Sequence, residues 1–280
     1  MITKFKSYLG QFEFIVGATL TFGMGFLVLI SSLLYPDGGE TINLSARLMP
    51  PFADSNFPLG ADPLGRNVLE RIILGGRISF SVGILSVAGA LMIGTVIGLL
   101  AGYYSGIADT FIMRFADIQL ALPFILLAIT IIAIVGPGLD RIIILMILSQ
   151  WVQYARLVRS SVLSIREREF IQAARSYGLP DSKIIFSHIL PNALGPLIIL
   201  MTLNVANNIL LESSLTFLGL GVDPQTPSWG NMLSEGRNYV QTAWWVTVFP
   251  GIAVMLSVLG LNLLGDWLRD RLDPLGNASR

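Results

Sequence analysis

Six polar side chains lie inside stretches of sequence that are otherwise apolar, and these residues are the first candidates for chemistry. They are Gln150, Gln153, Asn204, Asn207, Asn208 and Glu212. At 100° per residue, the last four fall within an arc of about 140° on one helix face. Such a group either lines a path for a polar solute or hydrogen-bonds neighbouring helices, and the sequence leaves both interpretations open. Gln150 and Gln153, one turn apart, are weaker candidates for the same surface.

The residues on which most enzymes depend are absent or isolated. The chain has no cysteine, and its single histidine, His188, cannot form a metal site alone. No GxxxxGK[ST] loop is present, so ATP chemistry is not expected on this chain. We therefore expect no catalytic residue, no metal site and no cofactor bound by the chain itself.

Composition identifies the class of protein. Of the 280 residues, 53% are hydrophobic and only 13% are charged. Soluble domains carry about 25% charged residues, so a cytosolic enzyme and a disordered chain are excluded. The formal net charge is 0 and no basic block is present, which excludes a nucleic-acid binder. A membrane protein with several spans remains.

Six stretches are apolar enough to cross the membrane as helices, which takes roughly 20 residues for about 30 Å of hydrocarbon. They cover residues 12–35, 78–103, 118–135, 142–158, 194–211 and 243–264. The first stretch follows Lys4 and Lys6 and could be a signal peptide. Its apolar core is too long for one, however, and the residues that follow Leu34 make a poor cleavage site. We expect an all-α polytopic protein with six transmembrane helices.

The distribution of Lys and Arg predicts the orientation. With both termini in the cytoplasm, twelve of the 18 Lys and Arg residues face inward and six face outward, as the positive-inside rule requires. Residues 1–35 then form the N-terminal tail and first helix, and residues 36–77 an extracytoplasmic segment. Residues 78–280 form the core, with five helices and an inward-facing loop at 159–192.

That cytoplasmic loop has a helical pattern of its own. Phe170, Ala173, Ala174 and Tyr177 are spaced as one face of a helix, and Gly178 suits a terminus that needs positive φ. Asp181 or Ser182 can cap a second short helix, in which Ile185 and Ile189 share a face. Two ordered helices with an apolar stripe favour a protein partner, although a helix lying on the membrane surface has the same pattern.

At these residues the chain resembles a known family. Gln172-Ala173-Ala174, followed by Gly178 and then by His188-Ile189-Leu190-Pro191, is similar to the EAA loop of ABC importer permeases. The resemblance implies a coupling helix that docks on an ATPase subunit. The residues that carry this role over to the present chain are Glu169, Phe170, Gln172, Ala173, Ala174, Tyr177 and Gly178. Gln172 replaces the motif's glutamate and His188 its usual isoleucine.

Four further segments narrow the resemblance to the C-type permeases of the dipeptide, oligopeptide and nickel branch. They are residues 58–69, 212–222, 227–233 and 262–274. The resemblance implies the type I importer fold, the cytoplasmic membrane of a prokaryote and import of di- or oligopeptides by alternating access. The alternative substrates are nickel, a metal chelate or a glutathione-like peptide.

The same resemblance implies partners. These are a homologous B-type permease, two ATPase subunits that bind ATP and Mg²⁺, and an extracytoplasmic solute-binding protein. A secondary transporter would show intramembrane Asp, Glu and His relays or repeated halves, and neither is visible here. A stand-alone receptor or channel subunit would lack the ordered docking loop.

Overall fold

A computed structural model describes residues 2–35 and 41–272, and within them every regular element is a helix. Five helical segments are long and apolar enough to cross a membrane. They belong to α1 (Ile2–Leu34), α2 (Val68–Tyr104), α5 (Leu139–Arg166), α8 (Leu190–Phe217) and α10 (Trp245–Leu272). The predicted all-α polytopic fold is therefore confirmed. Residues 36–40 of the predicted extracytoplasmic segment and 273–280 at the C-terminus lie outside the described residues.

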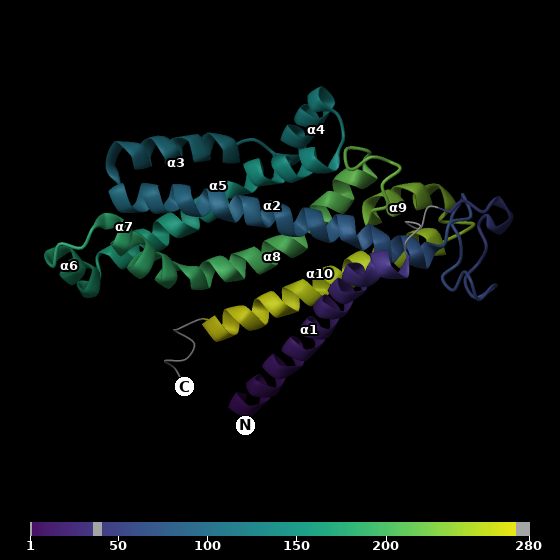
Figure 1. Ribbon diagram of the computed structural model, residues 1–280, viewed down its shortest axis with the longest axis horizontal. Coiled ribbons are helices and arrows are strands. Elements are labelled where there is room, and N and C mark those ends of the chain that lie inside the picture. The colour runs from purple at the N-terminus through teal and green to yellow at the C-terminus, as the bar shows by residue number, and fades with distance from the viewer. Residues whose placement is uncertain (1, 36–40, 273–280) are drawn as a thin grey trace.

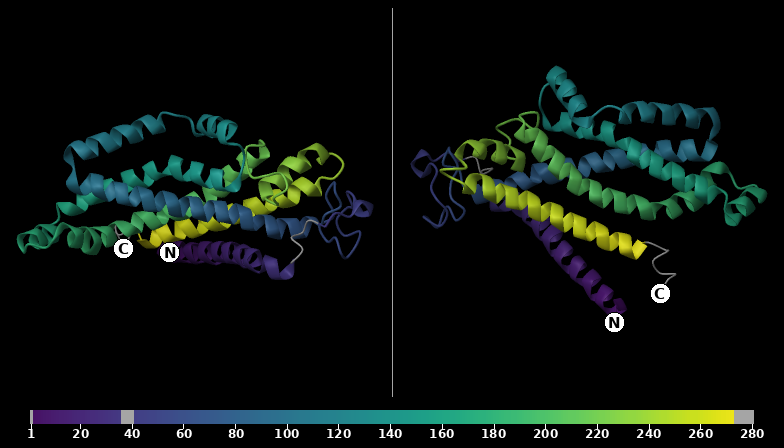
Figure 2. Two further views of the ribbon diagram at one scale, coloured as in Figure 1. Left: turned by 45° about the horizontal axis from the view of Figure 1, so that its top comes forward. Right: turned by 180° about the vertical axis from the view of Figure 1, so that it is seen from behind.

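The third predicted span differs from a straight helix. It is divided between α3 (Gly106–Leu120) and α4 (Phe124–Val135), which meet at an angle of 85°, and the chain has six spans if this bent pair is counted as one. The break lies at Pro123, which has no N–H to donate and disfavours helical backbone at Leu122. Figures 1 and 2 show α3 and α4 at the edge of the bundle away from α1 and α10.

The transmembrane helices extend beyond the apolar stretches that predicted them. Helix α2 begins ten residues before the predicted span, where the Asn67 side chain accepts a hydrogen bond from the Leu69 N–H at 2.9 Å. Helix α5 continues to Arg166, well into the predicted loop. Hydropathy shows which residues can lie in hydrocarbon, whereas a helix ends where capping and packing end it.

Small residues spaced four apart on α2 allow it to pack closely against α5. A Cβ on Gly94 would lie 2.5 Å from the Trp151 carbonyl oxygen, and one on Gly98 would lie 2.5 Å from that of Ala155. Helix α1 packs in the same way on α10, where a Cβ on Gly17 would lie 3.0 Å from Leu263 Cβ. Close packing of this kind holds membrane helices together, because surrounding lipid is as apolar as the side chains and gives no hydrophobic drive for association.

The two ends of the bundle differ in structure. Helix α1 begins and α10 ends on the side of the bundle that carries α6 (Glu169–Ser176) and α7 (Asp181–Ile184), while residues 41–67 and α9 (Trp229–Gly236) gather at the other end (Figure 1). There, Arg71 donates to Asp62 and to Glu235, each at 2.7 Å. Arg66 contacts the same two carboxylates at 2.6 and 2.8 Å, so these ion pairs tie the segment before α2 to α9.

Candidate functional site

The predicted docking loop begins with α6 and a left-handed turn. Helix α6 covers Glu169–Ser176, and Gly178 follows it with φ of +74°, the positive value that its sequence position predicted. The second helix, however, is not separate. Helix α7 passes through a π-helical turn at Ile185–Ile189 directly into α8, and Ile184, Ile185 and Ile189 are all buried. Burial of these isoleucines keeps the backbone helical from the loop into the membrane.

Helix α6 has one buried and one exposed face. Ile171 and Ala174 pack into the core of their own chain. Phe170 is 42% exposed and Tyr177 86% exposed, and Glu169, Gln172 and Ala173 are exposed as well. The sequence grouped Ala174 with the docking residues, but its side chain faces inward, because it lies at the edge of the apolar stripe next to the buried Ile171. Ala174 is therefore largely buried against its own chain.

Polar contacts that the sequence did not reveal fasten this loop to α2. The Tyr103 hydroxyl, near the end of α2, donates to Asp181 at 2.5 Å, and the Arg175 guanidinium lies 5.1 Å from the centre of the Tyr103 ring. Arg166 donates to the Gly102 carbonyl at 3.0 Å. These contacts thus fasten the loop to α2, and the helix that follows it is continuous with α8. Tyr103 and Asp181 are 78 residues apart, so no local pattern could pair them.

The structure divides the predicted polar stripe into two groups. Asn204, Asn208, Glu212 and Gln150 are buried, whereas Asn207 and Gln153 are exposed. In the buried group, Gln150 of α5 donates to Asn208 Oδ1 at 2.5 Å, and Asn208 of α8 donates to Ser86 of α2 at 2.7 Å. Asn208 therefore joins three transmembrane helices.

Asn204 and Glu212, one helical turn before and after Asn208, also make hydrogen bonds to neighbouring helices. Glu212 has no exposed surface and accepts hydrogen bonds from Ser79 of α2 at 2.8 Å and from Thr216 at 3.0 Å. Asn204 donates to the Tyr154 hydroxyl of α5 at 3.0 Å. Buried polar groups in a membrane protein need such partners, and these ones connect helices in the bundle.

The exposed pair borders a small polar hollow. Gln153 and Asn207 line a cavity of about 260 Å³ together with Gln119, Ser149 and Gln150, and apolar side chains, mostly leucines, form the rest of its wall. Gln119, which the sequence analysis missed, lies just before the break between α3 and α4. It donates to the Leu148 carbonyl at 2.6 Å and accepts from the Trp151 indole at 2.9 Å. The hollow therefore lies at the break between α3 and α4, beside α5 and α8.

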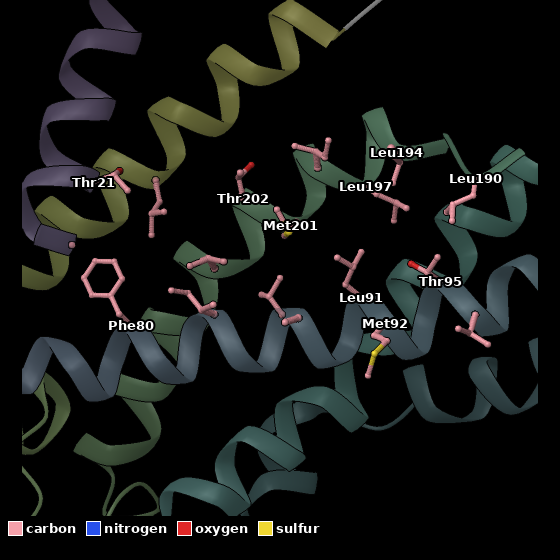
Figure 3. Close-up of a pocket in the computed structure, with 18 of the residues that line it drawn as sticks. Thr21, Phe80, Leu91, Met92, Thr95, Leu190, Leu194, Leu197, Met201 and Thr202 are labelled. Carbon is pink, nitrogen blue, oxygen red and sulfur yellow. The ribbon is translucent and has the colours of Figure 1, made fainter. Parts of the chain in front are cut away.

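A larger hollow elsewhere has the opposite character. Figure 3 shows it between α2 and α8, with α1 and α10 at one end, and its volume is about 720 Å³. Leu91, Leu197 and Met201 are typical of its lining, and Thr21, Thr95 and Thr202 supply its hydroxyl groups. This lining suits hydrocarbon and offers few groups that could hydrogen-bond a polar solute.

Comparison with known proteins identifies the family. Residues 94–275, from the last third of α2 to beyond α10, match the family described as "Binding-protein-dependent transport system inner membrane component". The chain belongs to this family. It is accordingly a multi-pass inner membrane protein and a transport component, and the matched region contains both the loop at α6 and the polar hollow.

Relatives support this assignment over most of their length. The chain is 45% identical to the dipeptide transport system permease protein DppC of Alkalihalophilus pseudofirmus, over 93% of this chain and 85% of the relative. It is 46% identical to the di/tripeptide permease DppC of Pseudomonas aeruginosa, over 80% and 75%. The glutathione permease GsiD of Pectobacterium atrosepticum is 45% identical over 77% and 72%.

A solved structure confirms the ABC importer permease fold. A chain of the MetNI methionine ABC transporter, in an inward-facing conformation, superimposes with a TM-score of 0.59. The match covers 73% of this chain and 97% of that chain at 20% sequence identity. This family member therefore has the fold expected of an ABC importer permease.

Proposed function

We propose that this chain is the permease subunit of an ABC importer for short peptides. The observation that carries the proposal is the exposed face of α6, where Phe170 and Tyr177 stand on a loop fastened to two transmembrane helices. Large aromatic residues that are exposed on a rigid element are typical of a docking contact. The peptide substrate is supported by relatives named for dipeptide and di/tripeptide transport.

The docking partner in this proposal is an ATPase subunit. Phe170 and Tyr177 enter a groove on the ATPase, while Glu169, Gln172 and Ala173 border the contact. Ala174 and Gly178 set the position of α6 without touching the partner. ATP and Mg²⁺ are bound by two such ATPase subunits, and this chain contributes no cofactor site.

The path for the peptide lies on the exposed face of α5 and α8 that carries Gln153 and Asn207. Asn207 is 17 residues after Leu190, about 25 Å along a helix that is about 42 Å long. It makes no hydrogen bond within the described residues. An unpaired amide costs several kcal/mol in hydrocarbon, so this face borders water and not lipid. The buried group around Asn208 holds together the helices that form this wall.

A second permease completes the path in the proposed complex. A homologous B-type subunit faces α5 and α8, and a solute-binding protein delivers the peptide at the end formed by residues 41–67 and α9. A glutathione-like tripeptide is the second candidate substrate, because a relative named for glutathione transport is as similar as those named for dipeptides.

Uptake by the reconstituted complex tests this function. The chain is assembled in liposomes with its partner permease, ATPases and binding protein, and accumulation of labelled Ala-Ala and of glutathione is measured with and without ATP. We expect ATP-dependent accumulation of the dipeptide. A complex that hydrolyses ATP in response to its loaded binding protein but accumulates neither compound would refute the proposed substrate class.

A further inference from the structure

The segment of residues 41–67 is held rigidly, although its only regular structure is one short 3₁₀ turn. The Ala61 N–H donates to the Met49 carbonyl at 3.0 Å, and the Trp245 indole of α10 donates to the Ala61 carbonyl at 3.1 Å. The Asp62 carboxylate, which is fully buried, accepts from two arginines. These contacts fix the shape of the segment before any partner binds, which lowers the entropy lost on binding.

Phe52 projects from this rigid segment into the surroundings. Its side chain is 84% exposed, among the most exposed large apolar side chains in the described part of the chain. The loop that carries it is closed by hydrogen bonds from the Phe52 N–H to the Pro58 carbonyl at 3.3 Å and from the Phe57 N–H to the Asp54 carbonyl at 3.0 Å. The exposed ring therefore has a fixed place on the surface.

The backbone of Phe52 is strained as well. Its φ is +64°, in the left-handed region that favours glycine and that bulky residues rarely adopt. Within residues 41–67, Leu48 also has a positive φ, of +52°, but its side chain packs against the apolar core around Trp229 and Trp245. Core packing compensates for the strain at Leu48, whereas the ring of Phe52 faces outward. Strain of this kind indicates a contact with another molecule.

Lipid is not that molecule, because the segment lies too far from the hydrocarbon. The uncharged stretch of α2 begins at Ile78, and the helix starts ten residues earlier at Val68, about 15 Å away along its axis. Headgroups extend only about 5–8 Å beyond the hydrocarbon on each side. Figure 1 shows residues 41–67 past the first turn of α2, at the end of the molecule farthest from α6. Phe52 therefore belongs to a part of the chain that stands in water.

Building on the proposed function, we infer that Phe52 anchors the solute-binding protein on this chain. The proposed ATPase contact is at the opposite end, on α6, and the proposed partner permease faces α5 and α8. Residues 41–67 lie elsewhere, joined to α10 through Trp245 and to α9 through Glu235. The remaining partner is the binding protein on which transport by this family depends. A rigidly held aromatic ring is the kind of residue that dominates the affinity of such a contact.

One substitution separates docking from folding. Phe52→Asn removes the ring and places at φ +64° a residue that tolerates left-handed backbone. The unfolding temperature should therefore equal or exceed that of the wild type. Affinity is measured by titrating the binding protein, loaded with Ala-Ala, onto the assembled transporter in lipid nanodiscs. We expect Phe52→Asn to bind at least about tenfold more weakly.

Two further variants serve as controls. Phe52→Tyr keeps an aromatic ring at the same position and should retain an affinity close to that of the wild type. Leu272→Asn makes the same kind of change at an exposed apolar residue at the other end of the bundle, where α10 ends. It should leave the affinity for the binding protein unchanged.

The outcomes separate this inference from the proposed function. Wild-type affinity in Phe52→Asn would overturn the anchor, and so would a loss of affinity accompanied by an equal loss of stability or shared by Leu272→Asn. ATP-driven uptake of Ala-Ala by the wild-type complex would still support a peptide permease in those cases. If uptake fails while Phe52→Asn alone weakens docking, peptide transport is refuted and the anchor stands.

Discussion

Substitution by leucine should affect stability at one of two neighbouring asparagines on α8 and uptake at the other. Asn208 has no exposed surface and hydrogen-bonds Gln150 of α5 and Ser86 of α2, while Asn207 is exposed and has no partner within the described residues. Leucine resembles asparagine in size, so Asn208→Leu and Asn207→Leu remove polar groups without creating large cavities. The pair thereby compares a structural amide with a path-lining one at nearly the same depth.

The size of the stability loss follows from the contacts. Interhelical hydrogen bonds in membrane proteins contribute about 0.6 kcal/mol on average and up to about 1.7. Asn208→Leu removes two of them and leaves the Gln150 amide without any partner. We expect the free energy of unfolding to fall by about 1–3 kcal/mol. Asn207→Leu removes no internal contact, so its free energy of unfolding should change by less than about 0.5 kcal/mol.

The measurement is reversible unfolding in mixed micelles, together with peptide uptake by the assembled transporter. Asn208→Leu should lower stability, and uptake should fall in proportion to the complex that is lost. Asn207→Leu should keep wild-type stability and assembly but reduce uptake per assembled complex several-fold. Equal destabilisation by the two substitutions would show that the division between buried and exposed amides is wrong. Normal uptake in stable Asn207→Leu would remove this residue from the path.

Three further predictions concern packing, coupling and orientation. Gly98→Val should lower the free energy of unfolding by about 1–3 kcal/mol or prevent assembly, because even the Cβ would lie 2.5 Å from the Ala155 carbonyl oxygen. Thermal unfolding measures this loss, and wild-type stability in the variant would contradict the α2–α5 contact. Tyr177→Ala should reduce co-purification of the ATPases while leaving the permease folded, and unchanged co-purification would refute its docking role. Tyr103→Phe removes the hydrogen bond to Asp181, so it should retain the ATPases but lower uptake per ATP hydrolysed. Unchanged coupling in this second variant would refute the role of that hydrogen bond. Reporters inserted within residues 178–183 should be cytoplasmic and those within 38–45 external, and an external result at 178–183 would reverse the orientation and exclude α6 as the coupling element.

Much of this protein could be predicted from local patterns alone. The apolar stretches located the transmembrane helices, because a span must consist of contiguous apolar residues whatever it packs against. The turn at Gly178 was predictable, since a helix followed by Gly and then by Leu179-Pro180 ends in a left-handed residue. The family resemblance followed from short motifs in the right order, and the match over residues 94–275 confirms it.

Contacts between distant segments decided the rest. The periodicity of α6 identified an apolar stripe but not which part of it would be buried, and only packing turned Ala174 inward and Tyr177 outward. The pairing of Tyr103 with Asp181 depends on where α2 ends beside α7, which no local pattern records.

The polar stripe shows most clearly what the sequence determined and what tertiary structure decided. An arc of 140° on one helix face is wide enough to meet both a neighbouring helix and an open surface. The sequence determined that Asn207 and Asn208 lie in the membrane on one side of α8. Only the positions of α2 and α5 decided that Asn208 joins helices while Asn207 faces the polar hollow. The physical reason is that adjacent residues on a helix point 100° apart, so the neighbouring helices, and not the residue type, determine what each side chain contacts.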